Sequence, residues 1–310
     1  MPNHTVNLKA VVLSSCPEIL RRYWSQVESS PLGFRLAKGV FWSLAGALIS
    51  RGIALLASIL VARVLGKEGF GELGIIQSTV GMFGVFAGFG LGMTATKHVA
   101  EFRVKDPKKA GRIIALSNLV AIISGGVMSV ILIILAPRLS SQTLAAPHLS
   151  EYLQIGAGLL FLSALNGVQT GALSGFEAFK TIAKVNLWAG IANFPLMVGG
   201  VYFAGIKGAV WGLVASMFVN WVLNHITIKN EAYRVGVHIT YNHCLQEWGI
   251  LWKFSFPAAL AGIMVGPVNW VCNAMLVNQP NGYAEMGIYN AANQWFIALF
   301  FLPGIIGQIV

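Results

Sequence analysis

The chain has 310 residues, of which 56% are hydrophobic and only 10% are charged, and its mean hydropathy is +0.69. A soluble domain carries about 25% charged residues, so this composition excludes an ordinary water-soluble protein and indicates a bilayer as the solvent. The net charge of +10 would indicate a nucleic-acid partner for a soluble protein. In a membrane protein it follows from basic residues collecting on the cytoplasmic side, and we expect no nucleic-acid partner.

Residues 1–38 do not form a signal peptide, because charged Glu18, Arg21 and Arg22 follow a short apolar patch. They are predicted to form a cytoplasmic tail. After the tail, eight stretches reach the roughly 20 apolar residues that a helix needs to cross a bilayer core. In chain order these are residues 40–64, 71–95, 113–135, 152–176, 185–203, 208–228, 254–277 and 286–310. Strands of a membrane barrel would be about ten residues long and alternating, so we predict an all-α, polytopic bundle of transmembrane helices.

Lysine and arginine residues alternate between the two sides of this predicted bundle. Sixteen of the 21 lie in the tail and in the second, fourth and sixth connections, whereas four lie on the other side. This bias predicts a cytoplasmic N-terminus, and the short connections predict antiparallel neighbouring helices. The eighth span runs to the end of the sequence without a basic flank, from which we expect a truncated protein with further helices.

A faint internal repeat relates the first two spans to the last two. Gly46 and Gly262 are 216 residues apart, and so are Gly71 and Gly287. Parallel repeats of six helices are a known way of building transporters. Two matching positions suggest such a repeat here.

Arg51 is the most informative single residue of the sequence. It lies eleven residues into the first span, about 16 Å along the helix, where an arginine costs about 2.5–3.5 kcal/mol. No Asp or Glu lies deep in any of the eight spans. We therefore expect Arg51 to face a water-filled cavity and to bind an anion. The alternative is that it bonds helix carbonyls or a carboxylate of helices beyond this sequence.

Amide side chains form stripes on four of the predicted helices, because residues three or four positions apart share a helix face. The stripes comprise Asn166 and Gln169, Asn220 and Asn224, Asn269 and Asn273 beside Trp270, and Asn290, Asn293 and Gln294. Such stripes point away from lipid, either into helix contacts or into a cavity. Helix contacts explain any one stripe, but four stripes with Arg51 predict a polar substrate cavity. Amides and indoles suit sugar hydroxyls there, and an arginine suits phosphate.

Motifs of nucleotide and metal enzymes are missing from the sequence. There is no P-loop and no H-E-x-x-H, no G-x-S-x-G, and the three cysteines lack the spacing of metal ligands. We expect no enzyme activity, no cofactor and no metal. Gly84, Gly88 and Gly92, spaced four residues apart, are predicted to let two helix backbones approach closely.

Three segments carry a family resemblance. Residues 60–71 read LVARVLGKEGFG, residues 90–92 read GLG before Lys97, and residues 167–179 read GVQTGALSGFEAF. The first is similar to the A-R-x-L-G-x-x-x-[F/Y]-G signature of polysaccharide flippases, which belong to the multidrug/oligosaccharidyl-lipid/polysaccharide (MOP) exporter superfamily. The other two resemble the same family's G-x-G-x…[R/K] stretch and fourth-span exit. The resemblance extends over about residues 36–310.

This resemblance implies a MATE-like arrangement of two six-helix lobes around a central cavity. The chain would then contain the first lobe at residues 39–235 and the first two helices of the second at residues 236–310. It also implies alternating access, with undecaprenyl-pyrophosphate-linked oligosaccharide moved from the cytoplasmic to the periplasmic leaflet of a bacterial inner membrane. Partners would be the bilayer and other membrane proteins of polysaccharide assembly, including O-antigen or lipopolysaccharide assembly. The alternatives are a cation-coupled multidrug or metabolite exporter of the same superfamily and a membrane-embedded glycan polymerase or ligase.

Overall fold

The structure is a computed structural model that describes residues 31–309, and the side chains of residues 48–260 and 264–300. The predicted tail therefore lies outside the described residues as far as residue 30. The described part of each predicted span is mainly helical, and no strand occurs among the residues described. All-helical architecture is thus confirmed.

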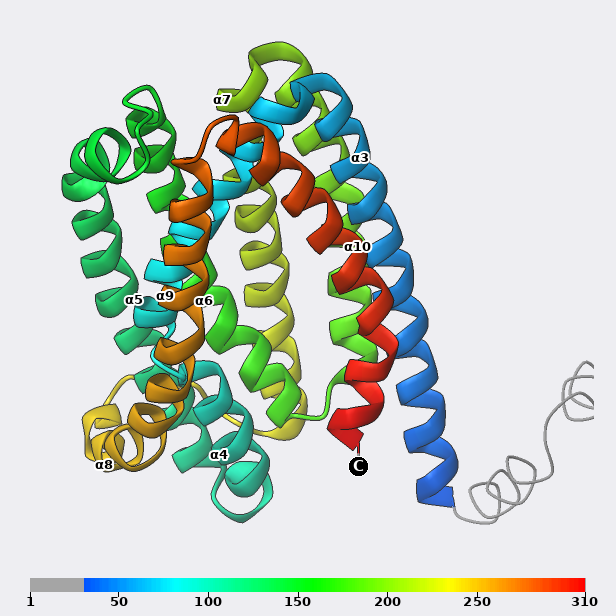
Figure 1. Cartoon of the computed structure of the whole chain (residues 1–310). Coiled ribbons are helices and arrows are strands. Elements are labelled where there is room, and N and C mark those ends of the chain that lie inside the picture. Colours follow the sequence, from blue (N-terminus) through cyan, green and yellow to red (C-terminus); the bar gives the residue numbers. More distant parts are fainter. Residues whose placement is uncertain (1–30, 310) are drawn as a thin grey trace, which may run out of the picture.

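Two very long helices each turn back on themselves. In α3 (Pro31–Gly88) the helical conformation is interrupted at Gly66, where φ is 70°. In α7 (Phe179–Val235) the interruption falls at Ala204 and Gly205, where the glycine has φ 56°. Glycine adopts positive φ without steric cost, so each helix reverses there and supplies two antiparallel arms (Figure 1). These four arms account for the first, fifth and sixth predicted spans and for the second span as far as Gly88.

Single helices and short connecting turns make up the rest of the chain. The longer elements are α4 (Leu91–Lys105), α5 (Pro107–Arg138), α6 (Leu149–Gly175), α9 (Phe256–Val277) and α10 (Gly282–Ile309). The short ones are η1 (Leu139–Thr143), η2 (Cys244–Glu247), α8 (Trp248–Ile250) and η3 (Leu251–Ser255). Asp106 starts α5 by accepting a hydrogen bond of 3.0 Å from the backbone N–H of Lys109, with Pro107 at the first helical position.

Five helical segments in the described part are long and apolar enough to cross a membrane, judged by length and composition. They are Leu48–Gly88, Pro107–Thr143, Leu149–Gly175, Phe179–Val235 and Cys244–Val277. Two of them contain the reversals at Gly66 and Ala204–Gly205. The membrane-helix class predicted from composition is confirmed.

Helix α5 shows how one sequence serves both lipid and protein contacts. Ile123, Val127, Val130 and Ile134 form an exposed apolar stripe at helical spacing, which suits a lipid-facing surface. The opposite face carries small residues such as Gly125, where an added Cβ would come within 3.2 Å of the Ala164 side chain of α6. Small residues at such a face let neighbouring membrane helices approach closely.

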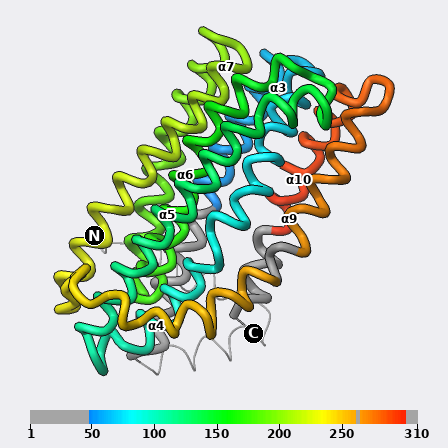
Figure 2. Tube along the Cα trace, turned by 90° about the vertical axis from the view of Figure 1, so that its left-hand side faces the viewer, coloured from blue at the N-terminus to red at the C-terminus, as the bar shows by residue number. Residues whose placement is uncertain are grey.

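The three basic connections gather at one end of the bundle. Helix α4, the α6–α7 turn and the α8 region lie together at the lower end in Figure 1. From the turn that joins them, α9 and α10 diverge, and α10 runs along α3 (Figure 1), while Figure 2 shows both on the same side of the bundle formed by α5, α6 and α7. Since consecutive helices alternate in direction, the predicted antiparallel arrangement is confirmed. Which side of the membrane the basic end faces stays a prediction.

Candidate functional site

The second predicted span is broken where a single helix was expected. Helix α3 ends at Gly88, Phe89 and Gly90 adopt positive φ of 42° and 64°, and α4 begins at Leu91. The break packs on the start of α9, because a Cβ at Gly90 would lie 2.9 Å from both the Ala258 Cβ and the Ser255 carbonyl oxygen. Broken membrane helices are typical of transporter binding sites.

Hydroxyl groups fix this break in place. Thr94 Oγ1 lies 3.1 Å from the Gly90 carbonyl oxygen, to which it donates, and 2.6 Å from Ser255 Oγ. The backbone N–H of Thr94 also bonds the Gly90 carbonyl, at 3.1 Å. These contacts join the first turn of α4 to the segment that leads into α9.

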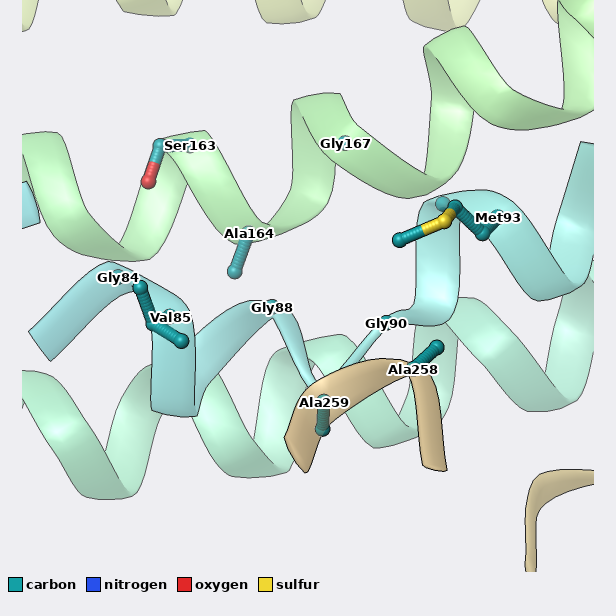
Figure 3. A pocket seen from close by; sticks show the side chains of 11 residues that line it. Gly84, Val85, Gly88, Gly90, Met93, Ser163, Ala164, Gly167, Ala258 and Ala259 are labelled. Carbon is teal, nitrogen blue, oxygen red and sulfur yellow. The ribbon is translucent and has the colours of Figure 1, made fainter. Parts of the chain in front are cut away.

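A cavity of about 320 Å³ adjoins the break. It lies between α3, α4, α6 and α9 and is lined by small residues, with Ser163 supplying a hydroxyl. Figure 3 shows Ala164 pointing from α6 toward the segment that carries Gly88 and Gly90, with Ala258 and Ala259 of α9 on the other side of that segment. The cavity is thus lined both by helices of the first six spans and by α9.

The glycine stripe serves this cavity as well as helix packing. At Gly92 an added Cβ would lie 2.8 Å from the Gly167 carbonyl oxygen, so the predicted close approach of two helices occurs there. At Gly88 it would meet nothing within 4 Å, because that glycine lines the cavity. The predicted close helix packing is therefore found at Gly92, whereas Gly88 borders the cavity and makes no such contact.

Four of the predicted site residues form one amide cluster between α6 and the second arm of α7. Asn224 Nδ2 donates to Asn166 Oδ1 and to Asn220 Oδ1, both at 3.0 Å. Asn166 Nδ2 donates to the Met217 carbonyl at 3.1 Å. Gln169, with its amide oriented to satisfy both groups, accepts from Trp221 Nε1 and donates to the Trp221 carbonyl, each at 3.3 Å. These amide side chains thus make contacts between helices, which was the alternative to a substrate cavity.

Gln169 also borders an open space. A cavity of about 400 Å³ at the basic end is lined by Asn118 of α5, Gln169 of α6, and His225 and Lys229 of α7. The His225 ring stacks on Trp221 with ring centroids 5.5 Å apart. The amide cluster is therefore buried on one side and reaches a polar cavity on the other.

Three further predicted residues bond the second arm of α3. Trp270 Nε1 donates to Thr79 Oγ1 at 2.9 Å. Asn273 Nδ2 donates to Ser78 Oγ at 2.9 Å. Buried Asn290 donates from Nδ2 to the Phe70 carbonyl at 3.5 Å. These bonds attach α9 and α10 to α3, and their serine and threonine partners were not predicted.

The remaining predicted residues lie at other places in the bundle. The side chains of Arg51 and Asn269 are exposed, and Asn293 is half-buried. Gln294 lines a cavity of about 260 Å³ together with Ser58 and Arg63 of α3. The structure therefore distributes the eleven predicted residues over several places, and a common substrate-binding role for them stays a prediction.

Two glycines identified by the sequence repeat meet in space. A Cβ at Gly71 would clash with the Tyr283 carbonyl oxygen, and a Cβ at Gly287 would clash with the Lys67 carbonyl oxygen. Lys67 and Tyr283 are also 216 residues apart. The contact of Gly71 with Tyr283 and the contact of Gly287 with Lys67 are therefore equivalent, with the two repeats exchanged. A reciprocal contact of this kind is what a two-fold relation between repeats produces.

Groups that could bind a metal are not found among the described side chains, since no three His, Cys, Asp or Glu residues cluster there. The chemistry available in the cavities is hydrogen bonding by amides, hydroxyls and indoles, with cationic groups at the basic end.

Curated proteins similar to this chain are named as a polysaccharide export protein, an O-antigen transporter and a lipid III flippase. The EPS I polysaccharide export inner membrane protein EpsE of Ralstonia nicotianae is 24% identical, over 86% of this chain and 60% of its own length. The putative O-antigen transporter of Shigella flexneri is 24% identical, over 89% and 65%. The lipid III flippase of Escherichia coli is 28% identical, over 83% and 62%. The chain thus spans about 60% of the length of these relatives.

Solved structures of similar fold are transporters of the MOP superfamily. An inward-facing multidrug resistance MATE family transporter of that superfamily matches with a TM-score of 0.63 at 17% identity, over 86% of this chain and 63% of its own. A MATE protein in the bent conformation matches with a TM-score of 0.57 at 16% identity, over 85% and 68%. These likenesses show the MATE-like fold predicted from the resemblance.

A family model provides the assignment of the chain. The model for polysaccharide biosynthesis proteins matches residues 36–309, which is nearly all of the chain that the structure describes. The chain therefore belongs to the polysaccharide biosynthesis protein family.

Proposed function

We propose that this chain forms part of a flippase that exports lipid-linked oligosaccharide across a bacterial inner membrane for surface polysaccharide assembly. The observation that carries the proposal is the family match over residues 36–309, together with relatives named as a polysaccharide exporter, an O-antigen transporter and a lipid III flippase. The substrate would be an undecaprenyl-pyrophosphate-linked oligosaccharide that moves from the cytoplasmic to the periplasmic leaflet. The protein would act as a transporter and not as an enzyme.

Alternating access is the mechanism we infer for this transport. The first lobe would comprise residues 39–235, with residues 236–310 beginning the second and the N-terminus in the cytoplasm. The break at Phe89 and Gly90 lies beside a cavity between α6 and α9, where a rearrangement of the lobes would alter its shape. At the opposite end, the reciprocal contact of Gly71 and Gly287 holds α3 against α10. Both features support a bundle that closes at one end and opens at the other.

Substrate binding would draw on the polar residues of the bundle. Arg51 supplies an exposed cation on the first arm of α3, suited to a pyrophosphate. Gln169 reaches the polar cavity at the basic end and suits sugar hydroxyls. Other polysaccharide-assembly membrane proteins would be partners.

Cation-coupled multidrug export is the second candidate, favoured by the MATE-like fold. Such a carrier would be expected to bind its cation with carboxylates deep in the membrane. Glu72 is the only acidic residue in the eight predicted spans, and it lies at a span end, with Oε1 3.0 Å from His148 Nε2. This arrangement favours the flippase.

Complementation of a flippase-null strain with the full-length gene tests the proposal. We expect the gene to restore surface polysaccharide, Arg51→Ala to reduce it at least tenfold, and Arg51→Lys to retain most of it because the charge remains. The tenfold figure follows from about 1.5–3 kcal/mol for a hydrogen bond to a charged group. Failure of the full-length gene to restore polysaccharide, together with a change in drug resistance in the Arg51→Ala strain, would contradict the flippase function and favour drug export.

A further inference from the structure

A separate cavity of about 350 Å³ lies at the basic end of the bundle, between α4 and the connection formed by η2, α8 and η3. Lys97 and His98 of α4 line one wall, and Lys253 and Phe254 of η3 line another. Lys97 Nζ lies 4.4 Å from the centroid of the Phe254 ring, a cation–π distance that fixes this ammonium group at the cavity. We call this space the headgroup pocket.

The charge of the headgroup pocket is positive. Glu247 is the carboxylate on its wall, but it accepts hydrogen bonds from Arg112 at 2.7 and 3.1 Å and lies 3.9 Å from Lys109 Nζ. Two cations outside the pocket lining therefore neutralise it. Lys97 and Lys253 are exposed and make no salt bridge within the described residues, so their charges remain available to an external anion.

His98 adds a buried imidazole ring to the pocket. Both ring nitrogens are buried and make no hydrogen bond within the described residues, although Nδ1 lies 3.4 Å from Glu101 Oε2. The imidazole ring meets Phe254 edge-on with centroids 5.7 Å apart. A buried N–H group without an acceptor costs free energy, and an anionic oxygen in the pocket would supply one.

The segment that covers the pocket has the pattern of an interfacial helix. Leu251 and Ser255 are buried, whereas Leu245, Trp248 and Trp252 are 63%, 45% and 57% exposed. Tryptophan side chains concentrate at the level of lipid headgroups, and amphipathic segments with basic residues lie along that interface. Figure 2 shows this connection crossing the end of the bundle near α4 before α9 begins. The pocket thus opens where lipid phosphates are found.

We propose that the headgroup pocket binds the phosphate diester of an anionic phospholipid from the adjacent leaflet, held by Lys97 and Lys253. Basic pockets between membrane helices bind such headgroups in general. The phospholipid would fasten α4 to the connection that leads into α9, across the same junction that Thr94 and Ser255 join by their hydroxyls. This binding does not depend on which substrate the protein exports.

The test is lipid retention by the full chain, measured by native mass spectrometry after delipidation and addition of phosphatidylglycerol or phosphatidylcholine. The variant K97Q/K253Q removes both pocket lysines, and K105Q/K108Q removes two exposed lysines of the same end that do not line the pocket. A lysine near an anionic surface contributes about fivefold in affinity. We therefore expect K97Q/K253Q to bind phosphatidylglycerol roughly 30-fold more weakly, and K105Q/K108Q to bind it as the unchanged protein does.

Three results would overturn the proposal. The first is equal retention of the anionic and the zwitterionic lipid by the unchanged protein. The second is an equal loss in both double variants, which would indicate a diffuse surface charge. The third is displacement of phosphatidylglycerol by millimolar inorganic phosphate, which would indicate a site for a soluble anion. A folded K97Q/K253Q protein is verified by its thermal unfolding in phosphatidylcholine nanodiscs.

Discussion

Replacing Gly90 by alanine tests the interpretation of the helix break most directly. Gly90 has φ 64°, and a non-glycine residue in that conformation costs roughly 1–2 kcal/mol. The new Cβ would also lie 2.9 Å from the Ala258 Cβ and the Ser255 carbonyl oxygen, and overpacking of a filled core typically costs about 1–3 kcal/mol. We therefore expect Gly90→Ala to lower the free energy of unfolding by about 2–5 kcal/mol.

Gly88→Ala is the matched control, only two residues away. Gly88 is helical, and its added methyl group would meet nothing within 4 Å. Alanine is favoured over glycine in a helix by roughly 0.5–1 kcal/mol, so this variant should be as stable as the unchanged protein or slightly more stable. The two substitutions add the same methyl group, and their effects should differ by at least about 2.5 kcal/mol.

The free energies can be measured by titrating the purified protein in mixed micelles with SDS and following helix content by circular dichroism. Equal stability of Gly90→Ala and the unchanged protein would refute the break and its contact with α9. So would an equal loss in Gly88→Ala, because the cavity beside Gly88 would then be filled.

Two further variants probe polar contacts at other places in the bundle. Asn166→Leu removes the hydrogen bonds to the Met217 carbonyl and to Asn224. At about 0.6 kcal/mol for each interhelical bond, it should lower the free energy of unfolding by about 1 kcal/mol. In a double-mutant cycle with Asn224→Leu, measured by SDS unfolding, the two losses of stability should be less than additive. Full additivity would contradict the amide cluster. Burial lowers the pKa of His98 from its ordinary value of 6.5, against the opposing effect of Glu101. The unfolded chain then binds more protons, so the stability that this group contributes is complete above pH 6.5 and is lost as the pH falls through the folded pKa. When the pH is lowered from about 7.5 to about 5, the melting temperature should therefore fall less for His98→Gln than for the unchanged protein. An equal fall in both proteins would contradict a buried neutral imidazole.

The sequence predicted the spans and the clustering of basic connections at one end of the bundle because the bilayer dictates both. Helix length follows from the apolar thickness, and Lys and Arg positions follow from the side of the membrane. The interruption at Phe89 was not predicted, since a single aromatic residue at positive φ does not change the pattern of an apolar run. Residues 244–253 were predicted only as a connection before the seventh span, although Trp248 and Trp252 flank the buried Leu251.

Amide stripes on the predicted helices could be recognised, but their partners could not. Stripe position requires only helical spacing, and burial of Asn166, Gln169 and Asn224 agrees with a face turned away from lipid. The partner depends on rotation and tilt, which packing against neighbouring helices determines. For this reason Trp270 donates a hydrogen bond to Thr79, whereas the side chain of Asn269, one residue earlier, is exposed.

The reciprocal contact of Gly71 and Gly287 provides a prediction about cooperativity between the two repeats. Each glycine faces a backbone carbonyl of the other helix, so alanine at either position should force α3 and α10 apart and cost about 1–3 kcal/mol. Once the helices have separated, the second methyl group adds little, and the double variant should cost about as much as one single variant. Gly81→Ala, on the same arm of α3 with nothing within 4 Å of its Cβ, should leave stability unchanged or slightly raised. SDS unfolding of the four proteins measures the coupling, and additive losses would mean that the two glycines lie at separate contacts, which would remove the two-fold relation inferred from their 216-residue spacing.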